Sequence, residues 1–263
     1  MNVTGTAVAT NIGMDDMRYS KKTIFDFSGA DFDTYNLQIN NCMNLVIHQP
    51  TIDQTISGDH CIKVENSSKI FIDQANTEAG NNGIFITRYS TECFVYESSA
   101  LNAENDGITF HATDSGTVPC GNNNVAYNCT GSGDEEGFDI TSGIGHYVIN
   151  GISSSVTGAN SIFIGRDAGA TVIDFDSPDF KVYITDCAYA NIVRGDIEAI
   201  ALRTGGEGDP PQNVTFYGSP SPTVLNIEDL DLDAIYSEKN QDFFDPFMGW
   251  IKNTVDWIEE NLR

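Results

Sequence analysis

The sequence is poor in positive charge, and this shortage limits the partners that the protein can have. It contains 13 Lys and Arg against 38 Asp and Glu, which gives a formal net charge of −25. A field of this sign repels nucleic acid and anionic lipid headgroups. We therefore expect no nucleic-acid partner. The acidity would suit bound cations, solubility or a saline environment, and of these we favour a halophilic or marine source.

Long hydrophobic runs are also missing. No window of about 18 apolar residues occurs, so the sequence predicts no membrane span. Residues Met1–Ile12 have neither the basic start nor the apolar stretch of a signal peptide. Apolar residues nevertheless make up 40% of the chain and include 15 Phe and 10 Tyr, enough for a large core. We therefore expect a folded protein and not a disordered chain.

Cysteine motifs typical of zinc sites are absent. The six cysteines form no C-x-x-C pair, and no His stands at zinc-ligand spacing. Most are therefore interpreted as small buried side chains. Only Cys120 and Cys129, which bracket a stretch rich in Gly and Asn, are near enough in sequence to suggest a local disulfide.

A repeat of short apolar triplets runs through the chain. The first series is Leu37–Ile39, Ile62–Val64, Ile84–Ile86, Ile108–Phe110, Phe138–Ile140 and Ile162–Ile164. A second series is Leu45–Ile47, Ile70–Ile72, Phe94–Tyr96, Val125–Tyr127 and Tyr147–Ile149. Successive triplets of the first series start 25, 22, 24, 30 and 24 residues apart. Each unit therefore holds at least two short strands, separated by residues typical of turns.

This spacing predicts an all-β protein with a single right-handed parallel β-helix over residues 1–235. Stacked units let each strand pair with its equivalent in the next coil, so that the apolar positions form internal ladders. A leucine-rich repeat would need a fixed L-x-x-L-x-L pattern, and a β-sandwich would not give in-phase spacing over five units. Further strands are expected at Val172–Ile173, Val182–Ile184, Ile200–Leu202 and Val214–Phe216, and loops at Thr113–Asn124 and Gly205–Pro211.

The C-terminal segment, residues 240–263, has a different pattern. Apolar residues follow at steps of 4, 3, 4, 3 and 4, with acidic residues off this stripe. The stripe consists of Phe244, Met248, Ile251, Val255, Ile258 and Leu262. One amphipathic helix is therefore predicted. We expect it to cap an open end of the β-helix, and the alternative is a seam for homo-oligomerisation.

Acidic residues recur at equivalent positions of two successive units. Because equivalent positions in neighbouring coils stack about 4.8 Å apart, Asp106 of one coil should lie beside Glu135, Glu136 and Asp139 of the next. Carboxylates this close repel one another unless a cation neutralises them, and oxygen ligands suit Ca²⁺. We predict a calcium site at these four residues. The alternatives are a purely structural ion, or a chance cluster without metal on an acidic surface.

The same residues carry a family resemblance. The run Asn123-Asn-Val-Ala-Tyr-Asn-Cys129, followed by Asp134-Glu-Glu-Gly-Phe-Asp-Ile140, resembles a coil of family 9 polysaccharide lyases of the pectate-lyase type. In that family an N-C-x-x-x-x-N-x-x-D-D-G-F-D-L stretch and a D-G-F in the preceding coil supply four calcium-binding carboxylates. By this resemblance Glu135, Glu136 and Asp139 match three of the ligands, and Asp106 matches the fourth. The strong match covers about residues 105–140.

The sequence departs from the family where the catalytic lysine is expected. The family's G-F-K-L-G segment corresponds to Ser161-Ile-Phe-Ile-Gly165, so Phe163 stands at the position of the lysine. Arg166 is the nearest basic residue, and we predict it as the catalytic base, although an Arg ordinarily stays protonated. A clamp on a substrate carboxylate is the alternative role. We predict Arg88 and His111 as substrate-binding residues.

These observations predict a Ca²⁺-dependent polysaccharide lyase that cleaves an acidic, uronate-containing polysaccharide by β-elimination. The first alternative is a non-catalytic glycan-binding β-helix, such as a viral or cell-surface spike, in which calcium is structural. An epimerase that shares the proton-abstraction step is another, and the fold does not choose among them. By the resemblance we expect the protein outside the cell or at a cell or virion surface.

Overall fold

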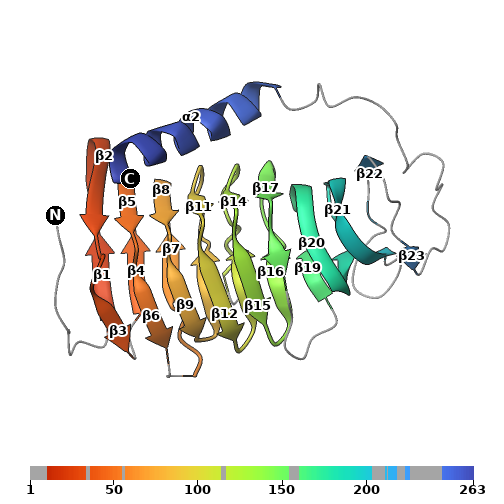
Figure 1. Ribbon diagram of the computed structural model, residues 1–263, viewed down its shortest axis with the longest axis horizontal. Coiled ribbons are helices and arrows are strands. Elements are labelled where there is room, and N and C mark those ends of the chain that lie inside the picture. Colours follow the sequence, from red (N-terminus) through yellow and green to blue (C-terminus); the bar gives the residue numbers. More distant parts are fainter. Residues whose placement is uncertain are drawn as a thin grey trace.

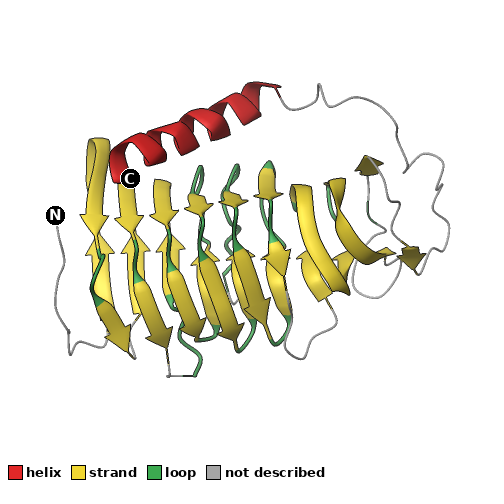
Figure 2. Cartoon of the chain, viewed as in Figure 1, coloured by secondary structure: helices red, strands yellow, loops and turns green. Residues whose placement is uncertain are grey.

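Parallel strands wind into one solenoid over most of the chain (Figure 1). The computed structural model describes residues 11–33, 36–54, 57–113, 117–153, 160–202, 211, 213–217, 223–225 and 245–263. Every strand pairing given for these residues is parallel and joins equivalent positions of neighbouring coils. Each coil contributes one strand to each of three sheets. Apart from these strands, the described residues form connecting loops and one helix (Figure 2). The predicted all-β parallel β-helix is confirmed.

The first sheet contains the first triplet series, in the predicted register. Its strands are β1 (Asn11–Asp15), β4 (Asn36–Asn40), β7 (Ile62–Glu65), β10 (Asn82–Ile86), β13 (Asp106–Phe110), β16 (Glu136–Ile140), β19 (Asn160–Ile164), β23 (Thr223–Leu225) and the last parts of the long strands β20 (Gly169–Ile184) and β21 (Tyr189–Leu202). Ile84, Ile108, Phe138 and Ile162 pair in succession, and each is at most 1% exposed. They form the predicted internal ladder.

The second sheet differs from the prediction by one residue in part of its length. Its strands are β2 (Arg18–Asp26), β5 (Met43–His48), β8 (Ser68–Asp73), β11 (Phe94–Tyr96), β14 (Val125–Tyr127), β17 (His146–Ile149), the first parts of β20 and β21, and β22 (Val214–Tyr217). Phe94 pairs with Phe71, so Val95 points into the core while Phe94 and Tyr96 point outward. A slip of one residue exchanges the two faces of a strand, and here both faces are apolar.

The third sheet closes each coil and was not predicted from the sequence. Its strands are β3 (Asp31–Asp33), β6 (Thr51–Gln54), β9 (Asn76–Ala79), β12 (Ser99–Ala103), β15 (Thr130–Gly133), β18 (Ile152–Ser153) and the middle parts of β20 and β21. These strands are short and carry many small or polar residues. Apolar alternation is therefore too weak in them to stand out.

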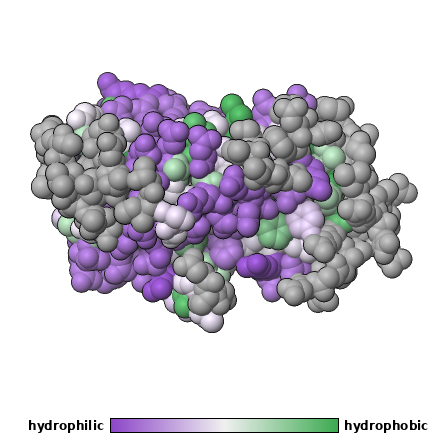
Figure 3. All heavy atoms as spheres, turned by 90° about the horizontal axis from the view of Figure 1, so that it is seen from below, coloured by the Kyte–Doolittle hydropathy of each residue, from purple (hydrophilic) through white to green (hydrophobic). Residues whose placement is uncertain are grey.

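Helix α2 (Asp245–Leu262) lies lengthwise along the outward face of the second sheet (Figure 1). Ile251 and Ile258 of the predicted stripe are buried in one cluster with Phe71 and Phe94 of the sheet. The predicted helix is thus confirmed, but the expectation that it caps an open end is wrong. The outward side chains of the second sheet are apolar, and the helix packs against them. The face turned away from α2 is mainly hydrophilic (Figure 3).

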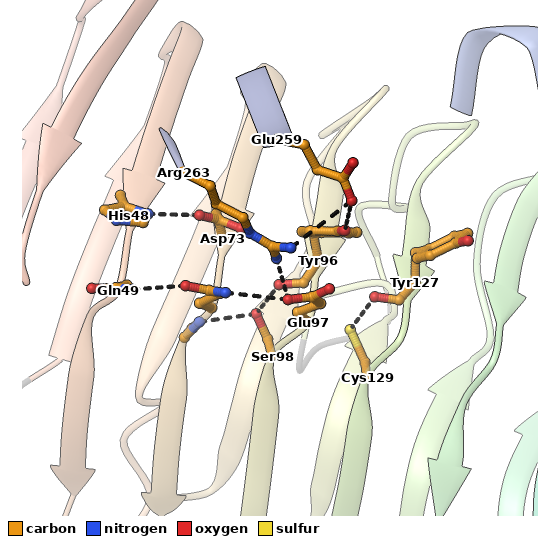
Figure 4. A network of polar contacts seen from close by, with 12 residues as sticks. His48, Gln49, Asp73, Tyr96, Glu97, Ser98, Tyr127, Cys129, Glu259 and Arg263 are labelled. Carbon is orange, nitrogen blue, oxygen red and sulfur yellow. Dashed lines mark hydrogen bonds and ion pairs between the residues drawn. The ribbon is translucent and has the colours of Figure 1, made fainter. Parts of the chain in front are cut away.

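Polar contacts hold the C-terminal end of α2 against the second sheet (Figure 4). Arg263 pairs with Glu97, and its guanidinium lies 5.4 Å from the centre of the Tyr96 ring. The Tyr96 hydroxyl donates a hydrogen bond to Glu259 at 3.4 Å. These contacts fix the position of the helix along the solenoid.

All six cysteines are buried thiols outside any disulfide, as most were interpreted. The local disulfide that the spacing of Cys120 and Cys129 suggested is not formed. The Cys120 thiol contacts the carbonyl oxygen of Ile86 at 3.3 Å, while the Cys129 thiol contacts that of Val95 at 3.5 Å. The two thiols thus contact different parts of the core. Among the described elements no helix has the length and hydrophobicity that a membrane crossing requires.

Candidate functional site

A cavity of about 400 Å³ opens on the outward face of the first sheet. Strands β10, β13, β16 and β19 supply its floor. Its lining consists of Asn81, Asn82, Phe85, Asn105, Asp106, Thr109, His111, Glu135, Glu136, Asp139, Thr141, Phe163 and Arg166. All four predicted metal ligands are in this set, together with Arg166 and His111. The fold therefore brings the predicted site residues together, with the exception of Arg88.

The strand register places the carboxylates. Asp106 of β13 pairs directly with Glu136 of β16, and Thr109 pairs with Asp139. Strand β16 packs closely against the third sheet at Gly137, where an added Cβ would stand 1.8 Å from the hydroxyl oxygen of Ser153. Only glycine fits there, so Gly137 allows the strand that carries Glu136 and Asp139 to lie this close to the third sheet.

Three carboxylates are close enough to share one cation. Asp106, Glu135 and Glu136 each offer one oxygen atom, and these atoms lie within 4.8 Å of one another. Neighbouring amides hold two of them in place. Asn82 donates a hydrogen bond to Asp106 at 2.9 Å, and Asn160 donates one to Glu136 at 3.0 Å. Asp139 lines the same cavity but lies outside this group of three.

Burial and mutual repulsion disfavour ionisation of the two aspartates. Burial, and then the neighbouring carboxylates of Asp139 and Glu136, raise the pKa of Asp106 to about 10. Burial, and then the charge of Glu136, raise the pKa of Asp139 well above its ordinary value, while Arg166 opposes this shift. A cation in the cavity would remove the cause of both shifts.

Two buried carboxylate oxygens of the cavity have no hydrogen-bond partner in the described part of the protein. Asp106 and Asp139 are 3% and 5% exposed, and the Oδ1 atom of each has no hydrogen-bond partner among the described residues. A buried acceptor without a partner is costly unless an ion or another molecule satisfies it. The donor set is all oxygen and anionic, which fits a hard divalent cation such as Ca²⁺. The residues present therefore fit the predicted metal.

Arg166 is the only Lys or Arg in the described cavity lining, and it contacts His111. The Nη1 atom of Arg166 lies 3.1 Å from Nε2 of His111, which is 3.8 Å from Oδ2 of Asp139. Arg166 has a positive φ of 52°, and its backbone N–H donates to Asp186 at 2.8 Å. The left-handed turn directs the exposed Arg166 side chain across the sheet, so that its guanidinium contacts His111 of an earlier coil.

Two residues singled out in the sequence have other surroundings. Arg88 is not part of the cavity lining and forms an ion pair with Glu65 at 2.9 Å, so its substrate contact stays a prediction. Phe163 pairs directly with Asp139 in the register, at the position where the resembling family has its lysine. Its ring lines the cavity.

Sequence reasoning missed the polar residues that surround the carboxylates. Asn82 bonds both Asp106 and Thr109, each at 2.9 Å. The signal was present, because Asn82 and Asn160 occupy the same column as Asp106 and Glu136 and pair with them in the register. A column in which two carboxylates are flanked by amides predicts such a network.

Comparison with known proteins gives a resemblance of fold. No family model and no curated protein matches the sequence. Among solved structures, a pectate lyase (pelN) from Paenibacillus sp. 0602 is similar with a TM-score of 0.47 and 9% identity, covering 67% of this chain and 62% of that one. The catalytic domain of Agl-KA is similar with a TM-score of 0.36 and 14% identity, covering 82% of this chain and 52% of that one. The chain thus spans less than two thirds of the length of either structure.

Proposed function

We propose that the protein is a Ca²⁺-dependent polysaccharide lyase that acts on a uronate-containing polymer. The observation that carries this proposal is the cavity itself. Asp106 and Asp139 present buried oxygens without partners beside Glu135 and Glu136, and Arg166 and His111 stand opposite them. A bound cation would satisfy these oxygens and offer a coordination position to the carboxylate of a uronate.

The residues divide the chemistry as follows. Asp106, Glu135, Glu136 and Asp139 would hold Ca²⁺, which when bound withdraws charge from the uronate carboxylate and acidifies the C5–H bond. Arg166, the base that the sequence predicts, would remove the C5 proton, and His111 beside it would contact the substrate. The electron pair of that bond forms the C4–C5 double bond as the C4–O bond breaks. The leaving oxygen then takes up a proton from water.

The reaction itself is the first test. Wild-type protein is incubated with pectate or alginate, with Ca²⁺ or with a chelator, and the absorbance of the unsaturated product is followed. We expect product only with Ca²⁺. A protein that binds Ca²⁺ and produces no unsaturated sugar from any uronate polymer would contradict the proposed function.

Arg166→Ala tests the proposed base. A positioned proton-transfer group contributes about 10²- to 10⁴-fold, so kcat should fall by that factor while Ca²⁺ affinity is retained. Arg194→Ala is a matched control, because Arg194 pairs with Asp174 away from the cavity. A rise in KM with unchanged kcat would assign Arg166 to substrate binding instead.

A glycan-binding module without catalysis is the second candidate, and Phe163 is the observation that favours it. An aromatic ring at the position of the family's lysine supplies no base, yet it suits contact with a sugar ring. In this case the protein would retain polymer in an affinity gel and release no product. Metal would then act only on stability.

A further inference from the structure

An aromatic pair extends the cavity along the solenoid axis. Asp139, Phe163 and Tyr183 pair with one another in three successive coils and occupy the outward centre of the first sheet. The ring centres of Phe163 and Tyr183 lie 5.1 Å apart, at an interplanar angle of 35°. Both side chains are half-buried, so each keeps part of its surface open to solvent. We name these two residues the aromatic platform.

On the N-terminal side of the cavity, the column of positions that contains Asp139, Phe163 and Tyr183 has no exposed ring among the described residues. Phe85 occupies the equivalent position one coil before Thr109, but it is 2% exposed. The His60 ring packs on it at 4.4 Å between centres, and the ammonium of Lys63 lies 5.7 Å from its ring centre. Within the described residues the column is therefore asymmetric, with an open aromatic surface on the C-terminal side only.

We infer that the aromatic platform is a binding subsite for a second pyranose unit of the glycan, next to the unit held at the carboxylates. This inference rests on the proposed function, because it deepens the same site. One coil separates Phe163 from Asp139, about 4.8 Å, and a second coil reaches Tyr183, so the platform spans about the length of one sugar ring. The polymer then lies along the solenoid axis.

The chemistry of the platform identifies its occupant. A pyranose presents a face of C–H groups that stacks on an aromatic ring, and this contact needs no charge from the protein. Phe163 and Tyr183 are both partly exposed on the outward face of the first sheet, so each ring keeps a surface that a sugar can contact. Because Phe163 also lines the cavity, the two surfaces are continuous. The subsite would extend the site toward the C-terminal coils only.

The test measures binding of oligogalacturonates of two to eight units, with Ca²⁺ present, by calorimetry. For wild type we expect affinity to rise with length as the platform is filled. Phe163→Ala should bind the longer oligomers about tenfold more weakly, which is about 1.4 kcal/mol, while Phe163→Trp retains binding. Tyr183→Ala should behave like Phe163→Ala. Tyr19→Ala is the control, because Tyr19 is 38% exposed on β2 of the second sheet.

Each outcome is decisive, and Ca²⁺ affinity of each variant checks that the carboxylates are intact. Weaker binding of long oligomers by Phe163→Ala, with normal Ca²⁺ affinity, supports the platform even if wild type forms no unsaturated product, in which case only the lyase fails. Equal binding by wild type, Phe163→Ala and Tyr19→Ala overturns the platform and leaves the lyase to its own assay. Absence of oligomer binding by wild type also overturns it.

Discussion

Asp106 is the residue at which burial, charge and hydrogen bonding meet most directly. Its side chain is almost fully buried, one oxygen accepts a hydrogen bond from Asn82, and the other has no partner among the described residues. Without a cation the group keeps its proton, since burial and neighbouring carboxylates raise its pKa to about 10. Protonation and metal binding therefore compete for the same site.

This competition predicts how stability depends on pH. The pKa of an unfolded Asp is about 3.9 and that of folded Asp106 is about 10, so the folded state binds the extra proton between these values. The free energy of unfolding of the metal-free protein should therefore decrease as pH rises through this window. Asp106→Asn carries no titrating proton, so its Tm should depend less on pH and exceed that of wild type at pH 8 in chelator.

Calcium should reverse the order of the Tm values of wild type and Asp106→Asn. At pH 8 added Ca²⁺ should raise the Tm of wild type, because a ligand that binds only the folded state stabilises it, and should raise that of Asp106→Asn far less. Asp139→Ala should also lose Ca²⁺ affinity. Glu260→Gln is the control, since it removes one charge from the exposed side of α2. Equal calcium shifts in all four proteins would rule out the site.

Among the elements, α2 shields the outward apolar face of the second sheet from solvent. It covers a row of aromatic and aliphatic side chains that the second sheet presents outward, including Phe71 and Phe94. The ammonium of Lys22 lies 4.2 Å from the ring centre of Phe71 and 3.9 Å from that of Trp257, so it stands between sheet and helix. Without α2 this apolar strip would face solvent, and such strips favour association.

Replacing Ile258 with Asp should detach the helix. The change places an unpaired charge at a position that is 0% exposed, and removal of a buried Ile alone costs about 2–5 kcal/mol. Both tryptophans of the chain, Trp250 and Trp257, lie on α2, so their fluorescence should shift to longer wavelength while the β-sheet circular dichroism persists. Glu260→Ala should leave the emission unchanged. A fluorescence spectrum like that of wild type would show that α2 stays docked without this contact.

At the scale of the whole molecule, the sequence predicted the part of the fold where one face of each strand is apolar and the other polar. The first sheet meets this condition in most of its coils, at Lys63, Thr109 and Asp139 for example, and its register was correct from Leu37 to Ile162. The second sheet is apolar on both faces, so its pattern allowed two registers and the wrong one was chosen for Phe94. Strands such as Thr130–Gly133 in the third sheet turn small residues to the core and give no pattern at all.

The candidate site follows the same division. Stacking of equivalent positions was sufficient to gather Asp106, Glu135 and Glu136, because regular strands carry or border them. The contact of Arg166 with His111 was beyond such reasoning, since it depends on a left-handed turn and on a side chain that reaches across coils. A regular repeat makes the positions of side chains on strands predictable, whereas the direction of a side chain on a turn requires the structure.

Net charge acts on the molecule as a whole and leads to the last prediction. With 38 acidic and 13 basic residues the folded chain repels itself, and salt screens this repulsion over a Debye length that falls from about 30 Å at 0.01 M to about 10 Å at 0.1 M. In chelator, Tm should therefore rise with NaCl and do so mostly below about 0.2 M. A continued rise at molar salt would instead indicate the adaptation to a saline environment that the composition suggests. A Tm independent of NaCl would show that self-repulsion contributes little to the free energy of unfolding, and that the acidic residues matter chiefly at the cavity.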